Sequence, residues 1–170
     1  MTQELETLQA LEQARLAHPR GPAPGSEGEA QALARFAEFF SSFSADRIER
    51  LLPATYADDI YFNDTLKAIR GRQALAHYLA ESAAAVEQCT VDILDQAASD
   101  SGEYWLRWKM MIRFKKLRRG VDTWTVGASH LRFNADGLVV YHQDYWNAAD
   151  GLFQHVPLLG WMIGKIKQRL

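Results

Sequence analysis

The segment 140–147, Val-Tyr-His-Gln-Asp-Tyr-Trp-Asn, carries side chains that could transfer protons. If this segment is a strand, alternation places His142, Asp144 and Trp146 on one face. An imidazole, a carboxylate and a large aromatic wall in one cavity are the components of an acid–base site. The local pattern does not decide which face points inward. His142 and Asp144 could equally be partners on a solvated face.

A second carboxylate, Asp64, ends the strand-like segment 59–64. It has the same parity as Ile60 and Phe62, so we expect it on the apolar face of that strand. Burial disfavours the charged form and raises the pKa of a carboxyl toward that of a useful base. The alternative is a turn aspartate that caps the end of the strand.

The sequence contains no recognisable metal or nucleotide motif. Its five histidines are scattered, and only His142 and Asp144 have a plausible same-face spacing. They supply two ligands, whereas a zinc site needs three or four. Phosphate-binding loops, a dinucleotide fingerprint and a nucleophile elbow are also missing from the sequence. We therefore expect neither a metal nor a cofactor.

Composition indicates one globular domain. The chain has 170 residues, of which 48% are hydrophobic, and its net charge of −2 excludes a chain that is basic throughout. The single cysteine, Cys89, excludes an internal disulfide. No apolar run reaches about 18 residues, and residues 1–20 lack the apolar region of a signal peptide. We expect a cytoplasmic protein without a transmembrane segment.

Helical spacing dominates the first half of the chain. Residues 1–25 are expected to form a helical arm and a Pro- and Gly-rich linker, mobile or docked on a partner subunit. Ser26 and Glu29 have the spacing of a capping box, where the domain should begin. The expected helices cover residues 3–17, 26 to about 43, 46–52 and 72 to about 87, and Pro53 is expected to end or kink the third of them.

The hydrophobic period changes to two from Thr90 onward. Strands are expected over residues 90–97, 104–116, 122–134 and 138–147, joined by short turns as an antiparallel meander. Helices followed by such a meander predict an α+β fold for residues 26–150. Residues 151–170 predict an appended amphipathic helix, which could lie on a membrane surface or dock on the fold or on a partner.

One face of the strand 104–116 is basic, and basic residues continue through the stretch 107–119. It carries Arg107, Lys109 and Arg113 with no acid between them. This pattern fits binding to nucleic acid or to an anionic membrane. It equally fits a solvated face or a subunit interface with compensating acids. Aromatic side chains for base stacking are scarce on this face, so we expect no nucleic-acid binding.

Four motifs together resemble the nuclear transport factor 2-like superfamily, in its SnoaL-like and ketosteroid isomerase-like group. They are Tyr56-Ala-Asp-Asp-Ile-Tyr-Phe-Asn-Asp64, Ile69-Arg-Gly-Arg-Gln-Ala-Leu, His130-Leu-Arg-Phe-Asn-Ala-Asp-Gly137 and Gln143-Asp-Tyr-Trp146, within residues 30–150. The resemblance implies a curved antiparallel sheet wrapped around helices into a cone with a deep apolar pocket. It also implies a homodimer formed through the outer face of the sheet.

The resemblance also implies roles for individual residues. Asp64 matches the catalytic base of ketosteroid isomerases, and Trp146 matches a pocket-wall tryptophan on the last strand. The match at Trp146 favours an inward orientation for His142 and Asp144. SnoaL-like cyclases also carry an acidic residue on that strand, which makes Asp144 a second candidate base.

Departures from the family pattern exclude two activities. Phe36 stands where ketosteroid isomerases have an oxyanion-hole tyrosine, and Ser129 stands where they have an oxyanion-hole aspartic acid. Because each lost donor costs roughly 10²–10³ in rate, ketosteroid isomerase activity is not expected. Gly127 and Ser129 also replace the Arg–Asp pair of the related epoxide hydrolases.

Two hypotheses follow from these residues. In the first, the protein is an enzyme in which Asp64 or Asp144 abstracts a proton and His142 relays one. Isomerisation, cyclisation or dehydration of a small, mostly apolar molecule would then need no cofactor. The expected ligand-binding residues are Phe36, Phe40, Phe62, Trp108, Ser129 and Trp146. In the second, the domain is a non-catalytic ligand-binding or protein-interaction scaffold.

Overall fold

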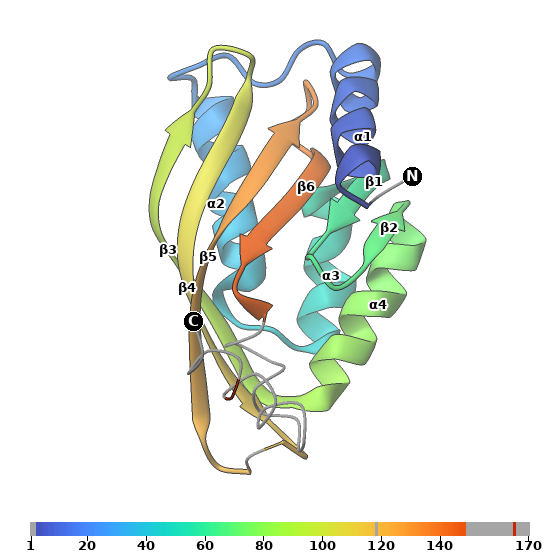
Figure 1. The fold of residues 1–170 in the computed structure, drawn as a ribbon. Helices are drawn as coiled ribbons and strands as arrows, with labels where there is room; N and C mark the ends of the chain where they lie inside the picture. The colour runs from blue at the N-terminus through green and yellow to red at the C-terminus, as the bar shows by residue number, and fades with distance from the viewer. Residues whose placement is uncertain (1–2, 118, 149–164, 166–170) are drawn as a thin grey trace.

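The computed structural model describes residues 3–117, 119–148 and Lys165 (Figure 1). Four helices and six strands lie in this part of the chain. The helices are α1 (Gln3–Ala17), α2 (Glu27–Ser41), α3 (Ala45–Thr55) and α4 (Arg72–Ala85). The strands are β1 (Tyr56–Asn63), β2 (Ala68–Arg70), β3 (Val86–Ala98), β4 (Glu103–Phe114), β5 (Asp122–Phe133) and β6 (Val139–Trp146). The expected α+β fold is confirmed.

The six strands form one curved sheet in the order β2-β1-β6-β5-β4-β3 (Figure 1). The hairpins β3–β4, β4–β5 and β5–β6 are antiparallel, as the meander pattern predicts. The expectation of an antiparallel sheet is nevertheless wrong at one position, because β1 pairs with β6 in parallel. No tight turn joins these two strands, so hairpin geometry does not set their relative direction. The sheet is therefore mixed.

The main core lies between one face of the sheet and helices α2, α3 and α4. Phe36 and Phe39 of α2 and Leu75 of α4 are almost fully buried there against the strands. The capping-box spacing is realised at the start of α2, where the Ser26 hydroxyl accepts a hydrogen bond of 3.2 Å from the Glu29 amide. The apolar stripe on α2 thus faces the sheet, as its spacing predicts.

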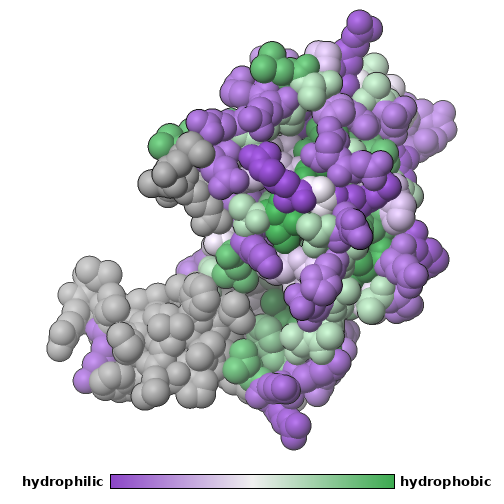
Figure 2. Space-filling view, turned by 90° about the vertical axis from the view of Figure 1, so that its right-hand side faces the viewer, coloured by the Kyte–Doolittle hydropathy of each residue, from purple (hydrophilic) through white to green (hydrophobic). Residues whose placement is uncertain are grey.

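Helix α1 packs on the opposite, outer face of the sheet, against β1 and β6 (Figure 1). Ala10, Leu11 and Ala14 contact Tyr61 and Tyr141 there. Its other side belongs to a face that is mostly hydrophilic, with small hydrophobic areas between the charged side chains (Figure 2). The structure therefore places the helical part of the arm on the chain's own sheet.

A buried cluster of ion pairs links helix α1 to strands β4 and β5. Glu103 of β4 accepts hydrogen bonds from Arg15 of α1, at 3.0 Å, and from Arg132 of β5, at 2.9 Å. Arg132 also donates to the backbone oxygen of His18, at 2.8 Å, directly after α1 ends. Burial tends to raise the pKa of Glu103, but hydrogen bonds from Arg15 and Ser101 and the charges of both arginines lower it to about 2.

Acids from neighbouring strands neutralise the basic strand. Arg107 pairs with Asp95 of β3, and Lys109 pairs with Asp92 at 3.2 Å. Farther along β4, Arg113 pairs with Asp122 of β5 at 2.7 Å. All three basic residues named on this strand face therefore have an acidic partner. The acids are distant in sequence but adjacent across the ladder, so the strand's own sequence does not reveal them.

Three further differences concern element boundaries. Pro53 lies inside α3 and does not end it: the helix continues to Thr55. The Thr55 hydroxyl donates to the Leu51 carbonyl at 2.9 Å in this last turn. Strand β1 begins at Tyr56 instead of residue 59, and β2 was not anticipated. Apart from Lys165, the helix expected over residues 151–170 lies outside the described residues, as does Arg118 of the basic stretch.

We predict that Glu103→Gln destabilises the fold by on the order of 3 kcal/mol, because it leaves Arg132 buried without a counter-charge. The folded-state pKa of Glu103 is depressed to about 2. Its stabilising contribution is thus present above its ordinary pKa of about 4.5 and is lost as the pH falls toward 2. Urea denaturation between pH 7 and pH 2 measures this, and the variant should lose part of the wild-type pH dependence. Equal stability of the two proteins at pH 7 would contradict the prediction.

Candidate functional site

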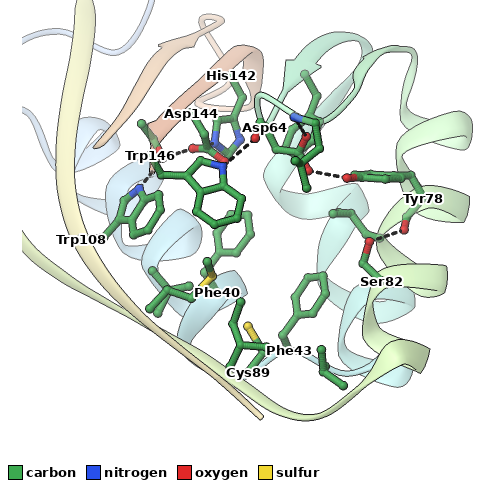
Figure 3. Close-up of a pocket in the computed structure, with 18 of the residues that line it drawn as sticks. Phe40, Phe43, Asp64, Tyr78, Ser82, Cys89, Trp108, His142, Asp144 and Trp146 are labelled. Carbon is green, nitrogen blue, oxygen red and sulfur yellow. Dashed lines mark hydrogen bonds and ion pairs between the residues drawn. The ribbon is translucent and has the colours of Figure 1, made fainter. Parts of the chain in front are cut away.

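A cavity of about 280 Å³ lies between the sheet and helices α2 and α4. Its lining is mostly aromatic and aliphatic, with a small polar group at one end (Figure 3). Every residue that the sequence singled out lines this one cavity: Phe36, Phe40, Phe62, Asp64, Trp108, Ser129, His142, Asp144 and Trp146. The structure therefore brings together side chains from α2 and from strands β1, β4, β5 and β6.

The parallel pairing of β1 with β6 places the two carboxylates beside each other. Phe62 pairs with His142 and Asn63 pairs with Gln143, so Asp64 and Asp144 each come directly after the last paired residues. Both point into the cavity (Figure 3). The face of β6 that carries His142 and Asp144 is thus the inner face, which local alternation alone left open.

A chain of hydrogen bonds runs through the polar end of the cavity. The Tyr56 hydroxyl lies 2.9 Å from His142 Nδ1, and His142 Nε2 lies 2.8 Å from Asp144 Oδ1. The Ser129 hydroxyl donates to the same Asp144 oxygen at 2.5 Å. Trp108 Nε1 in turn donates to the Ser129 oxygen at 3.0 Å. Asp144 is therefore held from two sides.

The direction of each hydrogen bond follows from the chemistry of Asp144. An ionised carboxylate only accepts hydrogen bonds, so His142 Nε2 carries the proton that faces it. Nδ1 of the neutral imidazole is then the acceptor, and Tyr56 donates to it. Burial, followed by the charge of Asp144, raises the pKa of Tyr56 well above its usual value, so this hydroxyl keeps its proton.

Both hydrogen bonds to Asp144 end on Oδ1. Among the described residues, no hydrogen bond reaches Oδ2 of the same carboxylate. The Asp144 side chain is 16% exposed, whereas His142 beneath it is 1% exposed. Oδ2 is thus the carboxylate oxygen that remains available to a molecule in the cavity.

Asp64 is both a turn aspartate and a desolvated carboxyl. Its Oδ1 accepts from the backbone amides of Leu66, at 3.0 Å, and Lys67, at 2.9 Å, and its Oδ2 accepts from the Tyr78 hydroxyl. Burial raises the pKa of Asp64, and the charge of Asp144 adds to this, while the three hydrogen bonds act against it. The net shift is upward, as its place on the apolar face predicts.

Gly127 makes room for Trp108. A Cβ atom at position 127 would lie 2.5 Å from two ring atoms of Trp108 and 2.8 Å from the backbone oxygen of Tyr145. The indole therefore lies across the glycine, where its Nε1 reaches Ser129. His142 is held similarly by aromatic neighbours, with ring centroids of Phe62 at 4.9 Å and Phe36 at 5.3 Å.

The sequence did not identify Tyr56 or Tyr78 as site residues. Tyr78 shares one face of α4 with the lining residues Leu79 and Ser82, and that helical spacing is the signal that could have found it. Tyr56 carries no comparable signal in the sequence, because its contact with His142 depends on the pairing of β1 with β6. The wall opposite the carboxylates comes from β3 and β4, including Cys89 and Phe114.

The described residues contain no group of three or more His, Cys, Asp or Glu side chains able to hold a metal ion. No helix in the same part of the chain is long and apolar enough to cross a membrane.

A family model of the SnoaL-like domain matches residues 33–142. The chain belongs to the SnoaL-like domain family. This match begins within α2 and ends at His142, halfway along β6, so it includes Asp64 and stops two residues before Asp144. A comparison with curated proteins found no significant match.

Solved structures share the fold at low sequence identity. A Catenulispora acidiphila protein with a ketosteroid isomerase-like fold, in complex with trimethylamine, is 17% identical with a TM-score of 0.63, and the match covers 76% of this chain and 95% of that one. A Mycobacterium tuberculosis epoxide hydrolase of the LEH-like type is 16% identical with a TM-score of 0.60, covering 85% and 99%. A phenazine biosynthesis-related protein from Pseudomonas aeruginosa is 17% identical with a TM-score of 0.57, covering 74% and 85%.

We predict that Tyr78→Phe raises the pKa of Asp64 further, because it removes one of the hydrogen bonds that oppose the effect of burial. Carbon-13 NMR titration of the aspartate carboxyl groups measures the change. Ser82→Ala, which leaves the bond to Asp64 in place, is the matched control. An unchanged or lower pKa in Tyr78→Phe would contradict the prediction.

A second prediction concerns Gly127→Ala. The added methyl group collides with Trp108, so we expect a loss of about 1–3 kcal/mol of stability. Because the collision pushes the indole away from Ser129, the tryptophan fluorescence should also change. Ala128→Gly on the opposite face of β5 is a control for the backbone. A stable variant with unchanged emission would show that the glycine is not needed.

Proposed function

We propose that this SnoaL-like protein binds a small, mostly apolar molecule and performs acid–base chemistry on it without a cofactor. The observation that carries the proposal is the presence of two carboxyl groups, Asp64 and Asp144, in one largely apolar cavity. Isomerisation, cyclisation and dehydration are the reactions of this kind, because each proceeds by proton transfers in a site shielded from water.

The two carboxyl groups suit different roles. Asp144 has a free Oδ2, while Ser129 and His142 orient the carboxylate through Oδ1, so we assign it as the base. Asp64 has a raised pKa and holds a proton at higher pH than an ordinary aspartate, so we assign it as the acid. His142 positions the base, because its Nε2–H donates to Asp144 Oδ1. Trp108, Trp146 and the three phenylalanines Phe36, Phe40 and Phe62 form the wall.

Other proteins of this fold bind small molecules. One is the trimethylamine complex described above, and another is a Mycobacterium tuberculosis protein in complex with estradiol-17β-hemisuccinate, 21% identical with a TM-score of 0.58. The epoxide hydrolase and the phenazine biosynthesis-related protein are consistent with chemistry in the corresponding pocket. They support a small-molecule role and do not specify the substrate.

The alternative is a non-catalytic domain that holds a ligand in the same cavity. The absence of oxyanion donors at Phe36 and Ser129 favours it, since Ser129 already donates to Asp144. Against it, a buried carboxyl without a use is a cost to stability. We favour the enzyme for this reason.

A homodimer through the outer face of the sheet also stays a proposal. Trp124 and Val126 of β5 are 59% and 65% exposed on that face, beyond the area that α1 covers. Exposed apolar side chains in one area are typical of interaction surfaces. Light scattering of Val126→Lys against wild type tests this, with a dimer expected only for wild type. The cytoplasmic location and the lack of nucleic-acid binding remain predictions.

The acid–base proposal predicts proton exchange at carbon. Wild-type protein is incubated in D₂O with small cyclic and aryl ketones, with and without an amino group, and deuterium incorporation is followed by NMR. Asp144→Asn should slow exchange by roughly 10²–10⁴ at saturating ligand. Asp136→Asn, an exposed turn residue outside the cavity, is the control for the same change of charge. Exchange at wild-type rates in both Asp64→Asn and Asp144→Asn, or none in the wild type, would favour the non-catalytic alternative.

A further inference from the structure

The side-chain hydrogen-bond donors at the polar end of the cavity are already engaged within the protein. Trp146 Nε1 donates to the backbone oxygen of Asp64 at 2.7 Å, and the Tyr78 hydroxyl donates to the Asp64 carboxylate. Trp108 donates to Ser129, and Ser129 and His142 both donate to Asp144. Figure 3 shows these bonds directed from one lining residue to another.

The remaining donors do not alter this arrangement. The Ser82 hydroxyl donates to the backbone oxygen of Tyr78 at 2.9 Å. The Cys89 thiol, a weak donor, lies toward the opposite, apolar end (Figure 3). Among the described lining residues, the polar end therefore offers a ligand acceptor atoms, foremost Asp144 Oδ2, and no uncommitted strong side-chain donor when Asp64 is ionised.

The charges of the lining point the same way. Two carboxyl groups face the cavity, and its described lining contains neither lysine nor arginine. Lys67, whose amino group lies over the ring of the lining residue Tyr78 at 5.3 Å, is not itself part of the lining. The charge of Asp144 disfavours the ionisation of Asp64, and that repulsion contributes to the raised pKa of Asp64. A ligand with a positive charge relieves this repulsion, and an anion adds to it.

The rest of the cavity fits an apolar body. The walls near the carboxylates are aromatic, with Phe62, Trp146 and Tyr78, whose ring faces attract cations. Phe43 and Cys89 lie at the far end (Figure 3). At about 280 Å³, the volume is near the lower end of the roughly 300–1,000 Å³ typical of drug-sized ligands, so the occupant is small.

We propose that the cavity selects a small apolar amine in its protonated form, whose ammonium group donates to Asp144 Oδ2 while its apolar body extends toward Phe43. This inference deepens the proposed function and rests on its cavity, because it names the class of substrate. A carboxylate ligand is rejected, since its oxygens would meet acceptor atoms of like charge. A neutral alcohol binds less tightly than the amine, because it gains a hydrogen bond without the charge attraction.

The experiment compares three probes that share one body: 3-phenylpropylammonium, 3-phenylpropan-1-ol and 3-phenylpropionate. Isothermal titration calorimetry at pH 7 measures their binding to the full-length protein. We expect the ammonium probe to bind at least about tenfold more tightly than the alcohol, a difference of about 1.4 kcal/mol. The carboxylate should not bind at millimolar concentration. Comparable affinities for all three, tighter binding of the carboxylate, or no binding by any of them would overturn the proposal.

The variant Asp144→Asn tests the contact itself. The amide oxygen can keep the hydrogen bonds from Ser129 and His142, which directs its NH₂ group to the position of Oδ2. The affinity of this variant for the ammonium probe should be at least about tenfold lower than that of the wild type. The difference in affinity between the ammonium probe and 3-phenylpropionate should become smaller. Asp136→Asn should bind like the wild type. If Asp144→Asn keeps wild-type affinity for the ammonium, the proposed contact is wrong. The wild-type comparison stands without this variant if the variant fails to fold.

The two proposals can fail separately. Selective ammonium binding without exchange of carbon-bound hydrogen in any amino ketone supports this ligand class and contradicts the enzyme. Exchange in ketones that lack an amino group, together with equal binding of the three probes, supports the enzyme and contradicts the ligand class.

Discussion

The cavity depends on the parallel pairing of β1 with β6. These strands are distant in sequence, yet Phe62 pairs with His142 and Asn63 with Gln143. Side chains at paired positions lie on the same face of a sheet, so this register sends His142 inward with Phe62 and brings the two carboxylates together. A shift of β6 by one residue would turn His142 and Asp144 to the outer face, where α1 packs.

The hydrogen-bond chain from Tyr56 to Trp108 determines what the cavity offers to a ligand. Buried polar groups need partners, and here the donors satisfy Asp144 and one another. These bonds satisfy the buried polar groups, and among the described lining residues they leave no strong side-chain donor for a developing oxyanion except Asp64 when it is protonated. A shared fold is therefore compatible with different chemistry, because the chemistry is set by the direction of a few hydrogen bonds.

Local patterns were informative wherever one element's own side chains determine the outcome. The serine cap and apolar stripe of α2, and the alternation along β4, depend on spacing within one segment. The parity of Asp64 likewise predicted its burial. The boundary predicted at Pro53 was wrong, because its missing amide removes one helical bond while packing of Leu52 and Thr55 keeps the turn in place. Strand β2 has three residues, too few for a period to be visible.

From the sequence alone came the α+β order of elements, the family resemblance and the candidate residues of the site, because all of these depend on residue type and spacing. The tertiary structure decided which face of β6 is inward, that Tyr56 and Tyr78 complete the site, and that acids neutralise the basic strand. Each of these depends on contacts between different segments of the chain. Side-chain periodicity within a segment carries no information about the partner strand, its direction or its register.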